Sequence, residues 1–237
     1  MPLHESTHPL IASKMTKLRD VNTAPDEFRR KLREITFYLG FEATRTLGVS
    51  SKTIKTPMGD FDGVKIQENV AIIPILRAGL SMADGMLELL PNAAVHHIGM
   101  YRAKESLLPI QYYNRLPKGK TCDVAYVVDP CIATANTINA VVSILKRWGA
   151  KKIVVIAAIG SRLGVNRLLE LHPTVEVHIG AIDENISESG MIVPGIGDAG
   201  DRQFHTLDEI PDLLPLSPGN AVASPASIKR KRDTEAK

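Results

Sequence analysis

The segment VVDPCIATANT (residues 127–137) marks the end of a buried strand and the approach to a helix. The apolar residues from Ala125 to Val128 favour a strand, and Asp129-Pro130 prolongs neither a strand nor a helix comfortably. The next segment, INAVVSILKRWGA, has apolar residues at helical spacing and ends on a Gly-Ala pair. The sequence therefore predicts a strand, a loop and a helix in succession.

Strands and helices alternate in this way over most of the chain. Apolar runs predict strands at 70–75, 95–100, 124–128, 152–158 and 175–182. Helical periodicity predicts helices at 10–20, 25–47, 79–90, 138–149 and 164–172. In the second helix one face carries Phe28, Leu32, Ile35, Leu39 and Ala43. Such alternation predicts an α/β fold, a mainly parallel sheet with helices on both faces, with ligands beyond the carboxyl ends of its strands.

Composition limits the class of protein. The 237 residues, 44% hydrophobic and 23% charged, suffice for one good core. The longest apolar runs are too short to span a bilayer, and the first ten residues lack the layout of a secretory signal, so we expect a soluble, cytoplasmic protein without membrane partners. Cys122 and Cys131 have no metal-ligand spacing and are interpreted as ordinary thiols.

The charge of the chain is concentrated at its C-terminus. The last nine residues carry a net charge of +3, and the rest has equal numbers of acidic and basic side chains, which argues against a nucleic-acid partner. Residues 213–237 lack apolar periodicity, so we predict a folded domain at 1–212 and a disordered basic tail. Lys229–Arg232 is either a nuclear signal or anion-binding patch, or a solvated charge run.

The loop at 129–137 has the chemistry of a phosphate site. Amides at residues 133–137 would point from a helix N-terminus, and Thr134 and Thr137 add hydroxyl donors. Asp129 suits ribose hydroxyls or, through water, magnesium. The loop is neither a Walker loop nor a Rossmann fingerprint. A second interpretation stays open, in which Thr137 only caps a helix and Asp129-Pro130 only forms a turn.

Three further segments bring arginines and glycines to the same edge of the predicted sheet. IIPILRAGLSMADG (72–85) places Arg77 at a strand end and a glycine, Gly79, where backbone can approach closely. GMYR puts Arg102 beyond the next strand, and the Gly-rich stretch 191–206 is predicted to be irregular. Together they suggest a site for a multiply phosphorylated sugar and a flat partner. Alternatively, Arg77 forms a surface ion pair, Arg102 lies on a solvated face and Asp198 only makes a turn.

These residues carry a family resemblance. The chain resembles the uracil phosphoribosyltransferases, of the type I phosphoribosyltransferase fold, from HPLIASKMTKLRD (8–20) through FEATRTL, PILRAG, GMYR and VVDPCIATANT to PGIGDAGDR. The resemblance implies a β-arm or hairpin after Arg102 and a small hood over the base. It also implies pyrimidine salvage, the transfer of phosphoribosyl from 5-phosphoribosyl diphosphate to uracil, giving UMP and diphosphate.

The resemblance also implies residue roles. Catalytic roles fall to Arg77, Arg102, Asp129 and Asp198. Donor binding falls to Arg77, Ala78, Gly79, Arg102, Asp129, Pro130, Cys131, Ile132, Ala133, Thr134, Ala135, Asn136, Thr137 and Asp198. Uracil binding falls to Met191, Ile192, Gly197, Asp198 and Ala199. Mg²⁺ is expected to accompany the diphosphate without a dedicated protein metal site. Homodimers or homotetramers and, as in some members, a GTP effector are also implied.

The chain departs from the family pattern in three places. Its phosphate loop has Ala135 and Asn136 where the family often has glycine, and alanine tolerates left-handed backbone poorly. Met191 replaces a usual aromatic residue, and Arg162 stands near the mouth in place of a Pro-Glu-Gly loop. Two functions are therefore compared: an active transferase, and a degenerate, non-catalytic homologue that binds uridine nucleotide or a partner chain.

Overall fold

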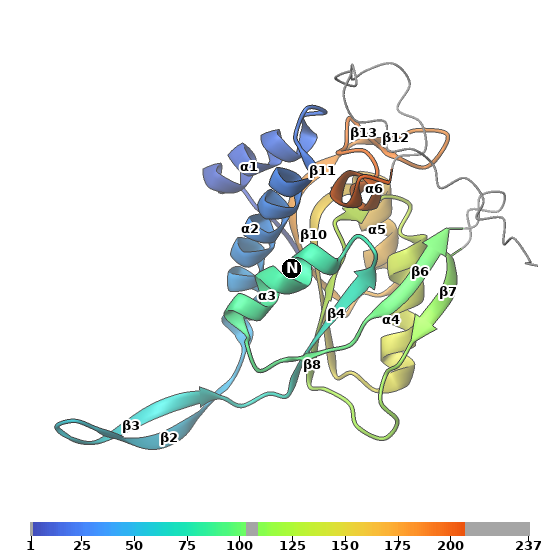
Figure 1. The fold of residues 1–237 in the computed structure, drawn as a ribbon. Helices are drawn as coiled ribbons and strands as arrows, with labels where there is room; N and C mark the ends of the chain where they lie inside the picture. Colours follow the sequence, from blue (N-terminus) through green and yellow to red (C-terminus); the bar gives the residue numbers. More distant parts are fainter. Residues whose placement is uncertain (1, 103–108, 207–237) are drawn as a thin grey trace, which may run out of the picture. The chain divides into compact units, whose positions relative to one another are not determined.

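A mainly parallel sheet forms the centre of the protein, which is described by a computed structural model for residues 2–102 and 109–206. Its strands run in the order β1 (Leu3–Glu5), β11 (Glu176–Asp183), β10 (Lys152–Ser161), β8 (Val124–Val128), β4 (Val70–Leu76), β6 (Ile98–Arg102) and β7 (Pro109–Asn114) (Figure 1). The short strands β5 (Ala94–Val95) and β9 (Cys131–Ile132) pair with β4 and β10. Among these pairs only β7 is antiparallel, to β6.

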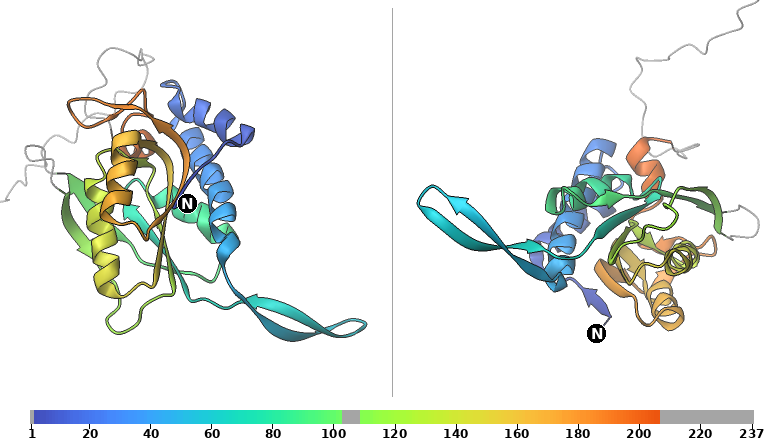
Figure 2. Two further views of the ribbon diagram at one scale, coloured as in Figure 1. Left: turned by 180° about the vertical axis from the view of Figure 1, so that it is seen from behind. Right: turned by 90° about the horizontal axis from the view of Figure 1, so that it is seen from below.

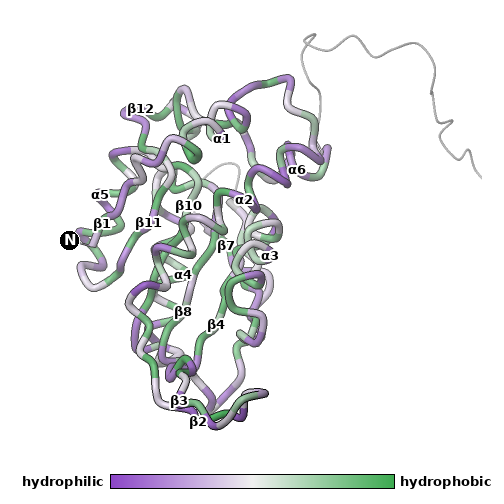
Figure 3. The backbone as a smooth tube through the Cα atoms, turned by 90° about the vertical axis from the view of Figure 1, so that its left-hand side faces the viewer, coloured by the Kyte–Doolittle hydropathy of each residue, from purple (hydrophilic) through white to green (hydrophobic). Residues whose placement is uncertain are grey.

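Helices cover both faces of the sheet, as predicted. On one face lie α1 (Pro9–Arg19), α2 (Pro25–Ala43) and α3 (Leu80–Leu89), and on the other α4 (Asn136–Trp148) and α5 (Arg162–Leu171) (Figure 2). Alternate residues of each central strand enter two separate cores: Ile72 packs with the first group of helices and Ile73 with the second. The central strands are accordingly apolar throughout (Figure 3).

Most predicted elements are confirmed within a few residues, because their apolar faces are buried. The five residues assigned to one face of α2 are all buried. The prediction at 95–100 was wrong in detail: β5 and β6 are separate, and His96 and His97 lie between them. A 3₁₀ turn, η1 (Thr44–Thr46), replaces the end of the helix predicted at 25–47.

Two antiparallel hairpins accompany the sheet. The pairing of β6 with β7 confirms the predicted arm after Arg102. The hairpin of β2 (Val49–Thr56) and β3 (Gly59–Ile66) was not predicted; it forms a sheet of its own and projects away from the main sheet in Figures 1 and 2. Its side chains are exposed on both faces, so the sequence has no alternation of apolar and polar residues that would predict these strands.

The Gly-rich stretch at 191–206 is more regular than predicted. It contains β13 (Ile192–Val193), which pairs with β12 (Asn185–Ile186), and the short helix α6 (Ala199–Phe204). The prediction of an irregular segment was therefore wrong, and the physical reason is a cap: the Asp198 side chain accepts a hydrogen bond from the Asp201 amide, 3.0 Å away, and starts α6.

The C-terminal tail and membrane-spanning helices were also considered from the sequence. The predicted tail at 213–237, with Lys229–Arg232, lies outside the described residues. Within the described part of the chain, no helix combines the length and the apolar character needed to span a membrane.

Candidate functional site

A cavity of about 640 Å³ opens beyond the carboxyl ends of β4 and β8, the edge at which the sequence predicts a ligand. Four segments line it: the end of β4, the loop from β8 to α4, the hood from β12 to α6, and the β6–β7 arm. Segments separated by more than 100 residues in sequence thus meet at one site.

The cavity collects most of the predicted site residues. Those that line it are Arg77, Ala78, Asp129, Cys131, Ile132, Ala133, Thr134, Ala135, Asn136, Thr137, Met191, Ile192, Gly197, Asp198 and Ala199. Gly79 and Pro130 do not line it. Arg102 ends β6, and its side chain lies outside what the structure describes.

Some lining residues were missed from the sequence. Tyr101 and Tyr112 come from the β6–β7 arm, and Asp201 lies in the first turn of α6. Asp201 belongs to the quoted PGIGDAGDR motif, so a signal for it was present. Arg162, expected near the mouth, does not line the cavity and instead pairs with Glu184 at 3.2 Å.

The loop from β8 to α4 has the features of an anion site. Ala135 is the N-cap of α4 with φ 62° and ψ 4°, the left-handed conformation anticipated for this position, and it gives the helix no side-chain cap. The first amides of α4 are therefore left to a ligand or to water. Thr137 lies inside the first turn, so it does not act as the N-cap.

A buried hydroxyl lies in the same loop. The Thr134 Oγ1 atom is buried and has no hydrogen-bond partner among the described residues. A buried hydroxyl without a partner is costly and is found where a ligand or water completes the site. Thr134 lines the cavity beside the uncapped helix start, so a turn of its side chain would bring the hydroxyl to the same anion.

Two glycines hold the cavity loops close to the backbone beneath them. A Cβ on Gly79 would lie 2.4 Å from the carbonyl oxygen of Val128, which confirms the close approach predicted there. A Cβ on Gly164, at the start of α5, would lie 2.1 Å from the carbonyl oxygen of Ala133. Ser161 Oγ donates to the same oxygen at 2.6 Å. Gly79 and Gly164 do not line the cavity themselves, but each lets the backbone of the cavity loops pack closely.

Arg77 faces the cavity while making an ion pair. Its Nη2 lies 3.0 Å from Asp201 Oδ1, and its Nη1 donates to Thr206 Oγ1 at 3.1 Å. The side chain is about half exposed. Arg77 therefore both forms an ion pair and lines the cavity. An anionic ligand in the cavity would compete with Asp201 for the guanidinium.

The hood over the cavity is tied to α1 by a network that sequence reasoning missed. Arg19 donates from Nη1 and Nη2 to the two Asp183 oxygens at 2.8 and 2.7 Å, and to the Gly195 carbonyl oxygen at 3.1 Å. The Gly195 amide donates to Asp183 at 2.8 Å. Hydrogen bonds from Arg19 hold the pKa of Asp183 below its ordinary value. Arg202 adds bonds to the carbonyl oxygens of Leu18 and Ile196.

The two cysteines behave as ordinary thiols, as predicted. Both are free. Burial raises the pKa of the Cys122 thiol to about 11. Burial also raises the pKa of Cys131, and the nearby carboxylates of Asp129 and Asp198 raise it further. Neither thiol is ionised near neutral pH, so Cys131 contributes shape rather than a nucleophile to the cavity.

The cavity offers oxygen ligands of the kind that Mg²⁺ prefers. Three carboxylates, those of Asp129, Asp198 and Asp201, line it. Carboxylate oxygens suit a hard cation that keeps part of its water shell and is shared with substrate phosphates. The donor set therefore fits magnesium that arrives with a phosphorylated ligand.

Comparison with known proteins agrees with this geometry. The sequence model of the family described as uracil phosphoribosyltransferase matches residues 5–206. Curated proteins named uracil phosphoribosyltransferase include one from Dictyoglomus thermophilum, 47% identical over 84% of this chain and 97% of its own length. Another, from Roseiflexus castenholzii, is 44% identical over 85% of this chain and 97% of its own length.

A solved structure shares the fold. The structure of a protein from Aquifex aeolicus superposes with a TM-score of 0.83 at 33% identity, covering 87% of this chain and all of the other. The match of the family model, the identity to its members and the shared fold extend over the described part of the chain. The chain therefore belongs to the uracil phosphoribosyltransferase family.

Proposed function

We propose that the chain transfers the 5-phosphoribosyl group from 5-phosphoribosyl diphosphate to uracil, forming UMP and diphosphate. The observation that carries this proposal is the loop from β8 to α4, where Thr134 and the uncapped start of α4 line a cavity that also contains Arg77. The loop would suit a phosphate, and Arg77 would suit a diphosphate. The relatives named uracil phosphoribosyltransferase favour this transferase over the non-catalytic homologue.

The donor would lie across the edge of the sheet. Thr134, Thr137 and the amides of 133–137 would hold its 5-phosphate, and Asp129 its ribose hydroxyls. Arg77 and Arg102 would bind the diphosphate, because a guanidinium matches phosphate oxygens in a two-pronged contact. Mg²⁺ bound with the diphosphate would neutralise part of its charge, and Asp129 and Asp198 supply suitable oxygen ligands.

Transfer would break the bond between the ribose C1′ and the diphosphate oxygen and form a bond from C1′ to uracil N1. The N1 proton would pass to the leaving diphosphate or to water. The leaving diphosphate gains negative charge as the ribose becomes oxocarbenium-like. Arg77 and Arg102 would stabilise the leaving group, and Asp198, where hood and donor meet, the positive ribose. Holding both reactants in one cavity supplies much of the remaining acceleration.

The hood would recognise uracil through its backbone. Gly195 and Gly197 have φ of 62° and 73°, so the chain turns there in a conformation that side chains resist. Ile192, Gly197 and Ala199 line the cavity around this turn, and their main chain would meet the base. Backbone amides and carbonyls in a fixed order can match the edge of one base.

An assay of UMP formation tests the proposal. Purified chain with labelled uracil, 5-phosphoribosyl diphosphate and Mg²⁺ is expected to form labelled UMP and one diphosphate per UMP. A matched variant, Thr134→Val, keeps the shape of the side chain and removes its hydroxyl, so it is expected to raise KM for the donor. Absence of UMP from correctly folded wild-type chain would favour the non-catalytic homologue.

Ala135→Gly tests the strain in the phosphate loop. Because Ala135 is left-handed, at a cost of about 1–2 kcal/mol, and glycine adds back about 0.5–1 kcal/mol of chain entropy, we expect an unfolding free energy higher by about 0.5–1 kcal/mol. Donor KM is expected to stay equal or fall. Denaturant unfolding and donor KM measure the two effects, and a less stable variant with weaker donor binding would refute the strain.

Arg19→Ala tests whether the link from α1 positions the hood. It leaves the mostly buried Asp183 carboxylate without its charged partner, which we expect to cost about 2–3 kcal/mol of stability. KM for uracil is expected to rise more than KM for the donor. The exposed Arg33→Ala, which loses only its pair with Glu88, serves as control. Equal effects of Arg19→Ala on both KM values would contradict a positioning role.

We further propose that the β2–β3 hairpin joins two copies of the chain in a homodimer, which can pair into a homotetramer. The hairpin stands apart from the main sheet and exposes Val49, Ile54, Met58, Phe61, Val64 and Ile66. An isolated two-stranded hairpin is marginally stable in water, and an apolar surface of this kind marks an interface.

Phe61→Asp is expected to lower the molar mass measured by light scattering to that of the monomer. The control Leu171→Asp places the same charge on an equally exposed apolar residue at the end of α5. A wild-type monomer, or an unchanged assembly in Phe61→Asp, would refute the role of the hairpin.

Two further expectations stay predictions. GTP activation rests on resemblance to some members of the family. A cytoplasmic location follows from the proposed reaction, because 5-phosphoribosyl diphosphate is too highly charged to cross a membrane unaided.

A further inference from the structure

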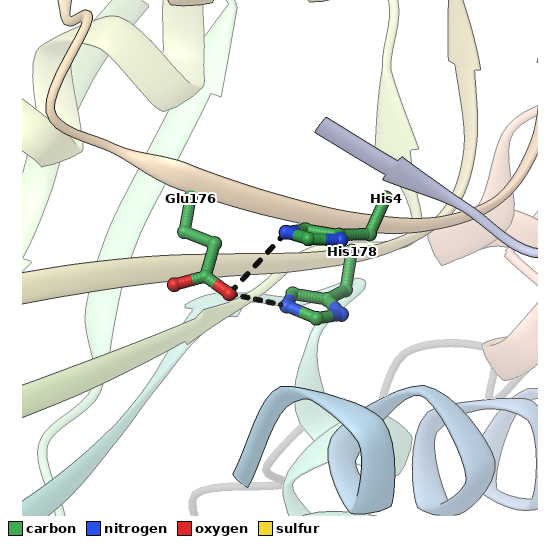
Figure 4. Close-up of side chains that lie close together, drawn as sticks. All are labelled: His4, Glu176 and His178. Carbon is green, nitrogen blue, oxygen red and sulfur yellow. Dashed lines mark hydrogen bonds and ion pairs between the residues drawn. The ribbon is translucent and has the colours of Figure 1, made fainter. Parts of the chain in front are cut away.

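A cluster of two histidines and one glutamate lies away from the cavity. His4 belongs to the edge strand β1 and is in register with His178 on β11, so their side chains share one face of the sheet, as does that of Glu176, two residues before His178 (Figure 4). Glu176 is the first residue of β11, at the opposite end of the sheet from the carboxyl ends of β4 and β8.

The ligand atoms of the three side chains converge. Glu176 Oε1 lies 2.9 Å from His178 Nε2 and 3.5 Å from His4 Nε2 (Figure 4). One ligand atom from each of the three side chains lies within 4.8 Å of the other two. In a tetrahedral zinc site with bonds near 2.0–2.1 Å, ligand atoms are separated by roughly 3.3 Å. The two measured separations bracket that value.

The surroundings fix the carboxylate and leave one histidine adjustable. Lys152 Nζ binds Glu176 Oε2 at 2.7 Å and Thr46 Oγ1 at 2.9 Å, which leaves Oε1 as the oxygen that faces the histidines. His178 is buried, whereas the His4 side chain is about half exposed. The two rings are stacked at 4.5 Å between centroids, so a shared ion requires His4 to tilt, and its edge position permits that.

We propose that His4, Glu176 and His178 bind one Zn²⁺ through two imidazole nitrogens and one carboxylate oxygen, with water as the fourth ligand. Two imidazoles favour zinc over magnesium, which prefers oxygen ligands, so this site is chemically distinct from the Mg²⁺ that accompanies the diphosphate. The ion ties the three-residue strand β1 to β11. The cluster does not line the cavity, so we expect the ion to act on the pairing of β1 with β11 and not on the transferred group.

Calorimetric titration of Zn²⁺ into the full chain, without an affinity tag and in excess Mg²⁺, tests the site. We expect one Zn²⁺ per chain, a higher thermal midpoint when it is bound, and the intense visible absorption of four-coordinate Co²⁺ when cobalt replaces zinc. His4→Asn is expected to weaken binding by at least the roughly 10- to 100-fold typical of lost outer partners. His172→Asn, outside the cluster, is the control and should bind as wild type does.

Two ligand variants distinguish a zinc site from an ordinary hydrogen-bonded cluster, because only a zinc site would lose zinc binding when a ligand is replaced. His4 is on an exposed edge strand, so circular dichroism is expected to show that His4→Asn folds. Glu176→Gln provides a second ligand variant. The proposal is overturned if wild type binds no Zn²⁺ in excess Mg²⁺, or if His4→Asn and Glu176→Gln bind it as tightly as His172→Asn. UMP formation by His4→Asn is expected to be unchanged.

Discussion

Replacing Arg77 by alanine is expected to lower kcat/KM for 5-phosphoribosyl diphosphate by about 100- to 1,000-fold, the usual cost of losing one charge-stabilising donor at an active site. Arg77 lines the cavity from the end of β4, and its side chain is about half exposed, so the fold does not depend on it. Arg77→Lys is expected to recover little of the loss, because an ammonium supplies a point charge without the planar fork of the guanidinium.

A second arginine provides the control for Arg77. Arg162 also follows a central strand and also pairs with an acidic residue, Glu184, but it does not line the cavity. Steady-state kinetics with varied donor should therefore show Arg162→Ala close to wild type. If Arg77→Ala and Arg162→Ala had the same donor kinetics, the Arg77 contact with Asp201 would be a surface ion pair and nothing more.

Uracil is expected to be used at least about a thousandfold better than cytosine, the order of discrimination reached by sites built around hydrogen bonds. Uracil has an N3–H donor between two carbonyl acceptors, whereas cytosine has an unprotonated N3 and an amino group. A backbone site in the hood cannot change its donors and acceptors to suit cytosine, so buried polar groups would stay unpaired. Competition against labelled uracil measures this ratio, and equal displacement by cytosine or a purine would refute the pocket.

Gly197→Val tests the same pocket from the protein side. Gly197 lines the cavity at φ 73°, where a β-branched residue is strained and adds bulk, so uracil binding is expected to be lost while donor binding is kept. Gly119→Val is a matched control, because Gly119 has φ 72° and open space around its Cβ position, outside the cavity. Loss of uracil binding in both variants would indicate a general effect of backbone strain.

The sequence predicted the elements whose periodicity reflects burial. Strand β8 was predicted because it is a continuous apolar run, whose residues enter the two cores in turn. Helix α4 was predicted because its apolar residues recur at helical spacing, and they pack into one core. The close approach at Gly79 was predicted from the backbone freedom of glycine, and strain at Ala135 from the glycine that the family often has there. These properties depend on residues that are neighbours in the sequence, so they can be read without knowing which distant segments pack together.

Features without a local pattern could not be predicted. The β2–β3 hairpin is exposed on both faces, and the six-residue α6 depends on a cap at Asp198. Arg19 and Asp183 are 164 residues apart, and nothing in either segment indicates that they meet. The cluster of His4 with β11 likewise depends on a pairing between the two ends of the chain.

A crystal structure with bound 5-phosphoribosyl diphosphate and Mg²⁺ tests the assignment of the cavity most directly. We predict that the 5-phosphate accepts hydrogen bonds from Thr134 Oγ1 and from the first amides of α4, with the diphosphate against Arg77 in place of Asp201. A donor whose 5-phosphate lay away from residues 133–137 would contradict the assignment.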